Sequence, residues 1–254
     1  MVEESDGQSV IVGRNPVREA LESDMHIEKV FLLNGIDGRV ASQMRRLAKD
    51  AGVPIQSVPA QRIERLAPGL NHQGIAAIIA KVEYLDVDDM LRAIAPDLDT
   101  VRATKPIVLI LDGVQDAHNL GAILRSAVAA GVGGVILPMR GSAFVNDAAL
   151  KTSAGMARLM PIARVDDIKL TITQLKERGY WVAGADGLGE ESVWSMDWDR
   201  PVAIVLGSEG DGIRDGVAKA CDYRVSIPMR GPAESLNVSV AAGILLFAAA
   251  RSRG

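Results

Sequence analysis

Residues 107–137 read IVLILDGVQDAHNLGAILRSAVAAGVGGVIL, and this stretch is the most informative about the fold. It begins with the wholly apolar run Ile107–Leu111, which predicts a buried strand. Leu120–Ala130 has helical spacing and stops at Gly131, and Val135–Leu137 predicts the next strand. The same alternation continues to the end of the chain. Because strands that are apolar throughout are buried on both faces, the sequence predicts an α/β fold with a parallel sheet covered by helices on both sides.

The chain ahead of this stretch divides into two parts. Residues 1–82 alternate strand and helix signals, with an N-cap and a following proline at Asn15-Pro16, and predict a small N-terminal α/β domain. Residues 83–105 are rich in aspartate and predict a linker that contains a short helix at Val87–Ile94. Residues 106–254 then form the larger C-terminal domain.

The composition limits the classes of function. The 254 residues carry a net charge of −4, so any RNA contact has to depend on local Lys and Arg side chains. The single cysteine, Cys221, excludes an intramolecular disulfide, and His26, His72 and His118 lack metal-ligand spacing, so no metal is expected. The first residues are acidic and polar, and the apolar run Val238–Ala250 is too short to span a bilayer. A cytoplasmic protein without membrane association is therefore expected.

Three polar turns follow apolar strands and precede helices. They lie in Leu111–Ala127, in Ile204–Ile213 and at Ser235–Ser239, which reads SLNVS. Turns that feed a helix expose backbone N–H groups and side-chain amides to a ligand, so the three turns predict one composite site. The candidate catalytic side chains are Asn119, Arg125, Glu209, Ser235 and Asn237.

Each turn alone also has an ordinary structural explanation. Asn119, Ser235 and Asn237 suit helix caps, and the glycines of LGSEGDGI suit a tight turn. Two features favour a ligand instead. Arg125 lies in a mostly apolar helix, where a charge requires a partner. Glu209 and its neighbouring aspartate would repel phosphate, so a neutral or cationic ligand fits the second turn. No dinucleotide fingerprint and no nucleophile elbow is present.

Together the three turns resemble, in order and spacing, the motifs of the SpoU/TrmH family of RNA ribose 2′-O-methyltransferases. The matching segments are Asn119-x-Gly121 with Arg125-Ser126-Ala127, Leu206-Gly207-x-Glu209-Gly210, and Ile227-Pro228-Met229 with Ser235–Ser239. In the N-terminal part, Gly13–Val17 and His72-Gln73-Gly74 resemble an L30e-like substrate-binding domain. That domain belongs to the branch of the family that methylates a guanosine of large-subunit (23S) ribosomal RNA.

The resemblance implies a fold and a methyl donor. The fold is of the SPOUT type, in which the C-terminal chain forms a trefoil knot. S-adenosylmethionine is implied to bind through backbone groups at Gly207, Ile227 and Leu236. A homodimer that packs through the knot domain is also implied. The apolar run Val238–Ala250 is then either a dimer surface or a helix buried in its own domain.

For the reaction, the resemblance implies that Arg125 activates the ribose 2′-hydroxyl. Because a guanidinium group stays protonated, stabilising the developing alkoxide or binding a phosphate suits Arg125 better than acting as a base. Asn119 is implied to orient the ribose or the arginine, and Glu209 to order its loop or the arginine. Ser235 and Asn237 are implied to hold the substrate and the loop.

For RNA binding, the resemblance implies contacts at Arg14, Asn15, His72 and Gln73. The implied function is S-adenosylmethionine-dependent 2′-O-methylation of a guanosine in 23S ribosomal RNA. Two alternatives stay open from the sequence. One is a methyltransferase that acts on transfer RNA or on another ribosomal RNA nucleotide, and the other is a non-catalytic RNA-binding factor of ribosome assembly.

Overall fold

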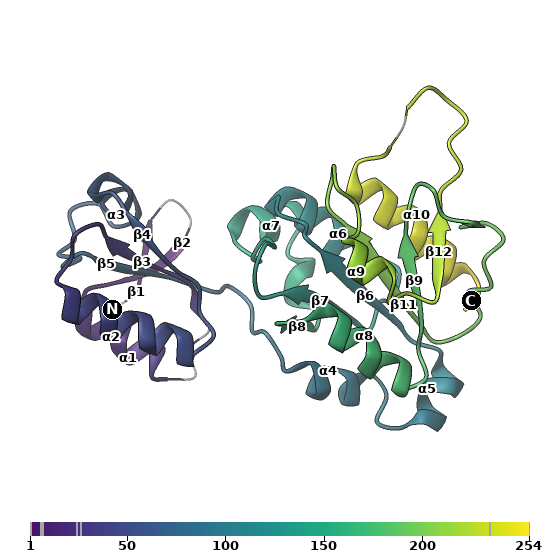
Figure 1. Cartoon of the computed structure of the whole chain (residues 1–254), viewed down its shortest axis with the longest axis horizontal. Coiled ribbons are helices and arrows are strands. Elements are labelled where there is room, and N and C mark those ends of the chain that lie inside the picture. Colours follow the sequence, from purple (N-terminus) through teal and green to yellow (C-terminus); the bar gives the residue numbers. More distant parts are fainter. Residues whose placement is uncertain (1, 6–7, 24, 26, 234, 254) are drawn as a thin grey trace. The chain divides into compact units, whose positions relative to one another are not determined.

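The protein consists of two compact units, Met1–Glu83 and Tyr84–Gly254 (Figure 1). The structure is a computed structural model, and it describes residues 2–5, 8–23, 25, 27–233 and 235–253.

The N-terminal unit is built on a five-stranded mixed sheet. Its strand order is β1-β2-β5-β3-β4, and among the described residues only the β3–β4 pair is parallel. The strands are β1 (Val2–Ser5), β2 (Gln8–Val12), β3 (Ile27–Leu33), β4 (Ile55–Val58) and β5 (Ile75–Ile79).

Three helices cover the two faces of this sheet. Helices α1 (Arg14–Leu21) and α2 (Gly38–Asp50) pack on one face, and α3 (Ala60–Leu66) packs on the other. The N-cap of α1 was expected at Asn15, but Gly13 is the N-cap and the helix begins at Arg14, two residues earlier than expected. Gly13 has a φ of 98°, a conformation that glycine adopts without steric cost.

The C-terminal unit contains a seven-stranded sheet in which every adjacent pair is parallel, with the order β10-β12-β9-β11-β6-β7-β8. The strands are β6 (Ile107–Asp112), β7 (Gly134–Pro138), β8 (Ile162–Val165), β9 (Trp181–Ala185), β10 (Glu191–Ser192), β11 (Val202–Gly207) and β12 (Tyr223–Ser226). All six residues of β6 and of β11 are buried. The predicted α/β class and parallel sheet are confirmed.

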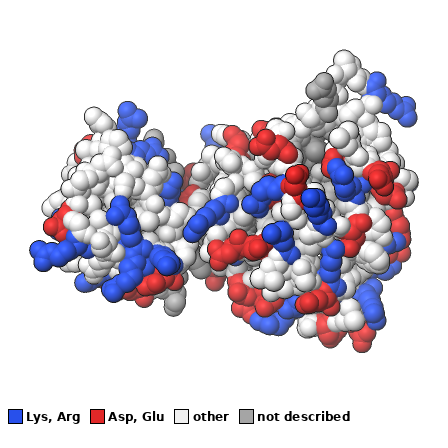
Figure 2. Space-filling view, in the orientation of Figure 1, with Lys and Arg blue, Asp and Glu red and all other residues white. Residues whose placement is uncertain are grey.

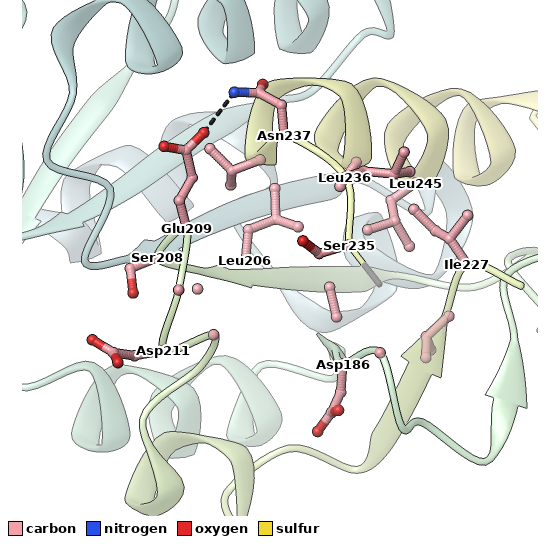
Figure 3. Close-up of a pocket in the computed structure, with 18 of the residues that line it drawn as sticks. Asp186, Leu206, Ser208, Glu209, Asp211, Ile227, Ser235, Leu236, Asn237 and Leu245 are labelled. Carbon is pink, nitrogen blue, oxygen red and sulfur yellow. Dashed lines mark hydrogen bonds between the residues drawn. The ribbon is translucent and has the colours of Figure 1, made fainter. Parts of the chain in front are cut away.

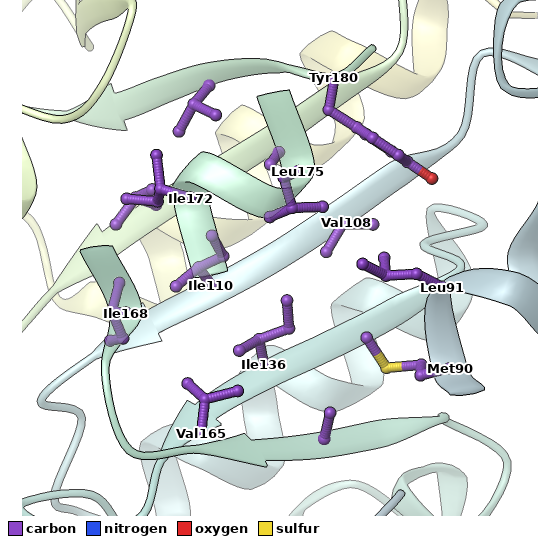
Figure 4. Packing of buried hydrophobic residues seen from close by; sticks show 14 of the residues in the cluster. Met90, Leu91, Val108, Ile110, Ile136, Val165, Ile168, Ile172, Leu175 and Tyr180 are labelled. Atoms are coloured by element: carbon purple, nitrogen blue, oxygen red, sulfur yellow. The ribbon is translucent and has the colours of Figure 1, made fainter. Parts of the chain in front are cut away.

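One face of the parallel sheet is covered by a large apolar core (Figure 4). The helices that contribute buried residues to it are α4 (Val87–Ile94), α5 (Leu98–Thr104), α8 (Ile168–Glu177) and α9 (Asp215–Ala218). The structure differs here from the expected linker over residues 83–105. Met90 and Leu91 of α4 are almost fully buried in this core, because α4 is amphipathic and its aspartates cap the helix or face solvent.

Helices α6 (Ala117–Ala129), α7 (Asp147–Thr152) and α10 (Val238–Arg251) form a second packed layer. Helix α6 packs against both α7 and α10, and α10 also packs on β11. The inner face of α10 is buried, whereas Val240 and Phe247 on its outer face are about half exposed. No helix in the described part of the chain combines the length and the apolar character that a membrane span requires.

Arg253, just beyond α10, ties the end of the chain to the sheet. Its Nε donates to the carbonyl oxygen of Lys105 at 2.8 Å, and its Nη2 donates to the carbonyl oxygen of Arg200 at 2.7 Å. Its Nη1 donates to the carbonyl oxygen of Ala249. Lys105 precedes β6 and Arg200 precedes β11, so one guanidinium group links α10 to the starts of two neighbouring strands.

Replacement of Arg253 by alanine is expected to destabilise the C-terminal unit. The change removes three hydrogen bonds to partly buried carbonyl groups, and we expect the free energy of unfolding to fall by about 1–3 kcal/mol. Denaturant unfolding followed by circular dichroism measures the change. Arg251→Ala is the matched control, because Arg251 is exposed at the last turn of α10 and should change the stability little. Equal stability of the two variants would contradict the role given to Arg253.

Candidate active site

The three polar turns lie at the carboxyl end of the parallel sheet. Strands β6, β11 and β12 end at Asp112, Gly207 and Ser226. Because the strands are parallel, the turns that follow them emerge at the same edge, which is where ligands bind in open α/β sheets.

A pocket of about 500 Å³ opens at this edge (Figure 3). Its wall includes Gly207, Ile227 and Leu236, the three positions predicted to hold the methyl donor. Leu206 and Leu245 make part of the wall apolar. Three predicted catalytic residues also line the pocket, namely Glu209, Ser235 and Asn237.

Carboxylates dominate the charge of this pocket. Asp186, Glu209 and Asp211 line it, and its wall contains no Lys, Arg or His among the described residues. Asp186 accepts hydrogen bonds from Arg224, which lies outside the wall. The pocket therefore favours a ligand that carries positive charge.

The turn after β11 is closed so tightly that only glycine fits at its start. The Ser208 N–H donates to the Gly212 carbonyl oxygen at 3.0 Å, and the Gly212 N–H donates to the Ser208 carbonyl oxygen at 3.2 Å. A Cβ atom added to Gly207 would lie 1.9 Å from the carbonyl carbon of Gly212. The backbone of this turn can therefore reach the pocket only if residue 207 has no side chain.

An ion pair that the sequence analysis missed anchors the far end of the same turn. Asp112 is 1% exposed, and its carboxylate accepts from the backbone N–H of Arg214 at 3.0 Å and from the Arg214 Nε at 2.7 Å. The hydrogen bond to Asp112 raises the pKa of Arg214. The sequence does carry a signal for this ion pair. Asp112 ends a wholly apolar strand, and a carboxylate buried there requires a charged partner.

The polar side chains of the three turns meet in one hydrogen-bonded cluster. A single oxygen of Glu209, Oε1, accepts from the Asn119 amide at 2.9 Å and from the Asn237 amide at 2.5 Å. The Asn237 Nδ2 also donates to the Asn119 Oδ1 at 3.1 Å. Figure 3 shows the bond between Glu209 and Asn237 at the rim of the pocket. The predicted composite arrangement of these three residues is thus present.

Asn119 is free to join this cluster because it does not cap its helix. The expected N-cap at Asn119 is wrong: α6 begins at Ala117 and Asp116 is its N-cap. The backbone N–H groups of Asn119 and His118 donate to the Asp116 carboxylate and lower the pKa of Asp116. Asn237 does cap α10, since its Oδ1 accepts from the Ser239 N–H at 2.9 Å, as the sequence predicts.

The structure does not bring Arg125 into the cluster. Arg125 lies six residues after Asn119 on α6, about 240° around the helix. Its side chain is exposed and has no hydrogen bond or ion pair within the described part of the chain. The expectation that a charge on this helix requires a partner within the protein is therefore wrong, because Arg125 lies on the solvent face. Ser235 is also exposed and lies in the pocket wall.

The four predicted RNA-binding residues lie in the N-terminal unit. The backbone N–H of Arg14 donates to the Gln73 Oε1 at 3.1 Å, which joins the start of α1 to the turn before β5. Gln73 has a φ of 49°, and the neighbouring His72 accepts the Gly74 N–H on its Nδ1 at 3.0 Å. Asn15 follows Arg14 in the first turn of α1 and is exposed. The structure thus places all four on two adjacent segments of the unit.

No metal centre is found among the described residues, where no group of three or more His, Cys, Asp or Glu side chains could hold an ion. His26 lies outside the described residues.

Comparison with known families decides the family. Residues 106–247 match the model of the SpoU rRNA Methylase family. The chain belongs to this family. Residues 10–85 of this SpoU family protein also match the model described as RNA 2′-O ribose methyltransferase substrate binding. By family, the protein is therefore an RNA methyltransferase.

Individual relatives agree with this assignment. YacO of Bacillus subtilis (strain 168), named for the TrmH family of tRNA/rRNA methyltransferases, is 37% identical over 249 residues, which are 98% of each chain. A protein of Staphylococcus haemolyticus named for the same family is 41% identical over 96% of each chain. Among solved structures, the AdoMet-bound rRNA methyltransferase of Sinorhizobium meliloti is 26% identical with a TM-score of 0.59. That likeness covers 95% of this chain and 86% of the other.

Proposed function

We propose that the protein transfers a methyl group from S-adenosylmethionine to the ribose 2′-oxygen of a guanosine in large-subunit (23S) ribosomal RNA. The observation that carries the proposal is the pocket at the carboxyl end of the sheet, with the Asn119–Glu209–Asn237 cluster at its rim. We further propose that residues 1–82 bind the RNA substrate and that residues 106–254 are the methyltransferase domain.

The pocket has the shape and charge for this methyl donor. S-adenosylmethionine supplies an activated methyl group on a cationic sulfur. The backbone at Gly207, Ile227 and Leu236 lines the wall and is available to hold the adenosine part. The exposed carboxylate of Asp211 complements the positive charge of the donor, whereas Asp186 is already paired with Arg224.

The polar cluster supplies the positioning that a displacement reaction requires. Asn119, Glu209 and Asn237 hold the three turns in one arrangement, so that the ribose and the methyl donor meet in line. Arg125 is exposed and free to bind RNA, where its charge stabilises the developing 2′-alkoxide or holds the neighbouring phosphate. Ser235, in the pocket wall, holds the substrate and the loop around it.

Two further features of the family fit this chain. We propose a trefoil knot at the C-terminus. Its support is that β12 lies in the sheet between β9 and β10, two strands that are consecutive in the chain. We also propose a homodimer that packs through the knot domain, supported by the apolar outer face of α10, where Val240 and Phe247 are exposed. A cytoplasmic location follows from the proposed RNA substrate.

The leading alternative keeps the chemistry and changes the substrate. The names of the relatives YacO and its Staphylococcus counterpart include both tRNA and rRNA. We favour ribosomal RNA because residues 106–247 match the SpoU rRNA Methylase model and residues 10–85 match a substrate-binding model.

Asp211→Asn is expected to weaken the binding of S-adenosylmethionine about three- to tenfold and to leave S-adenosylhomocysteine, which lacks the sulfonium charge, nearly unaffected. Asp211 is exposed in the pocket wall, so the change removes charge without removing a buried contact. Titration calorimetry at low salt measures both affinities. Asp50→Asn, at the exposed end of α2, changes the net charge equally and serves as the control. Equal weakening of both ligands by Asp211→Asn would contradict the charge argument.

The substrate is tested by incubating the protein with S-adenosylmethionine labelled in its methyl group. Unmodified large-subunit ribosomal RNA and unmodified bulk transfer RNA are offered separately. We expect label in the ribosomal RNA. Label in transfer RNA alone would overturn the substrate, and label in neither would favour the non-catalytic assembly factor.

A further inference from the structure

The N-terminal unit contains an open pocket of its own, of about 610 Å³. It lies between the outer side of α3 and the segment that leads to β5. Its wall is formed by Ala60, Gln61, Glu64, Arg65, Pro68 and His72. The wall thus combines a carboxylate, a guanidinium, an amide and an imidazole ring within one hollow.

The carboxylate and the imidazole ring of this pocket are held in fixed positions. The Gly69 N–H donates to the Glu64 Oε1 at 3.1 Å, and the Gly74 N–H donates to the His72 Nδ1 at 3.0 Å. A neutral His72 ring must therefore carry its proton on Nε2, which lies 3.7 Å from the Glu64 Oε2. The Glu64 side chain is 59% exposed, so its Oε2 remains accessible to a ligand.

This arrangement suits one nucleobase better than the others. Guanine presents two adjacent donors, N1–H and the N2 amino group, and a carboxylate is a pure acceptor that can receive both. Adenine and cytosine each place an acceptor nitrogen beside their amino group, and uracil places a carbonyl on either side of its N3–H. A carboxylate repels these acceptors. The His72 side chain lines the pocket and is 20% exposed, and aromatic rings of this kind stack on unpaired RNA bases.

The pocket adjoins the segments assigned to RNA. His72 belongs to the pocket wall and precedes Gln73, whose side chain accepts the Arg14 N–H. Figure 2 shows Lys and Arg side chains on the visible face of this unit, where they can attract an RNA backbone.

We propose that this pocket binds an unpaired guanine base of the RNA substrate, with the Glu64 carboxylate accepting from the guanine N1–H and N2 amino groups. The proposal rests on the proposed function, since it assigns to the N-terminal unit a base-specific contact with the same RNA. Glu64 acts here in substrate binding and takes no part in the methyl transfer itself.

The test measures binding of the full chain to three fluorescein-labelled oligouridines that carry guanosine, inosine or adenosine at the central position. Inosine keeps the N1–H of guanine and lacks the N2 amino group. Fluorescence anisotropy at low salt should give a dissociation constant for the guanosine oligomer about fivefold or more below the other two. Glu64→Gln should remove this preference, because its amide can still accept the Gly69 N–H but presents a donor to the base.

Glu19→Gln is the matched control, since Glu19 is exposed on α1 and lies outside the pocket wall. It should keep the guanosine preference. No preference in the unmodified protein, or a preference that survives Glu64→Gln, would overturn the proposal. The same protein preparations are also assayed for methyl transfer to ribosomal RNA. Transfer without a guanosine preference refutes only the base pocket, whereas a preference that Glu64→Gln removes, without any transfer, refutes only the enzymatic function.

Discussion

Gly207→Ala is expected to weaken S-adenosylmethionine binding by about 100-fold and to abolish methyl transfer. An alanine Cβ at this position would lie 1.9 Å from the Gly212 carbonyl carbon and 2.1 Å from its oxygen. The turn must then open, which breaks the paired hydrogen bonds between Ser208 and Gly212. Overpacking of this kind costs about 1–3 kcal/mol. Because the turn forms part of the pocket wall, the distortion weakens binding of the donor.

The control for this prediction lies three residues further along the same turn. A Cβ added to Gly210 meets no atom within 4 Å, so Gly210→Ala should bind the donor almost normally. Titration calorimetry on both variants measures the affinities, and circular dichroism verifies that both are folded. Equal affinities for the two variants would show that the turn does not shape the donor site.

Arg125→Ala is expected to lower the rate of methyl transfer by about 10²–10³-fold and to leave the affinity for S-adenosylmethionine unchanged. The loss follows from removing a cation that stabilises developing negative charge. The affinity should persist because Arg125 lies outside the pocket wall and has no bond to the Asn119–Glu209–Asn237 cluster. Single-turnover methyl transfer and calorimetry measure the two quantities.

Arg125→Lys separates charge from geometry. Lysine retains the positive charge but lacks the planar fork that binds two oxygens at once, so we expect an intermediate rate. If Arg125→Ala transferred the methyl group as fast as the unmodified protein, the role proposed for this residue would be excluded. A loss of donor affinity with an unchanged rate would place it in the donor site instead.

Burial patterns explain which parts of the fold could be predicted. The wholly apolar runs that became β6 and β11 predicted a parallel sheet, since only strands covered on both faces tolerate such sequences. The helix at Val87–Ile94 was predicted, but the aspartates gave the stretch around it the character of a linker. In the structure Asp86 caps α4 and accepts from the Asp88 and Asp89 N–H groups, while Met90 is buried. Capping residues and linker residues have the same composition, and only the packing of the apolar face separates them.

The sequence predicted which residues form the candidate site, but it did not predict which of their atoms are in contact. Asn119, Glu209 and Asn237 were expected to converge because each follows a strand of one sheet. The sharing of a single Glu209 oxygen by two amides could not be derived, since the partners are 90 and 28 residues away in the chain. The Asp112–Arg214 pair was missed for the same reason, with 102 residues between the partners.

The acidic net charge does not oppose RNA binding once the charge is located. The carboxylates of Asp186, Glu209 and Asp211 gather in the donor pocket, where they suit a cationic ligand. We propose that RNA contacts are made instead by Arg14, Arg125 and the turn at His72 and Gln73. Because only a few cations would neutralise RNA phosphates, the affinity for RNA should depend only weakly on salt concentration.

The identity of the methylated nucleoside distinguishes ribose methylation of ribosomal RNA from every alternative considered above. Large-subunit ribosomal RNA that lacks the modification is incubated with the protein and labelled S-adenosylmethionine, digested to nucleosides, and separated by chromatography with mass detection. The account predicts label in 2′-O-methylguanosine, at a single site that is lost with Arg125→Ala. Label on a base, or no label in RNA that the protein binds, would contradict it.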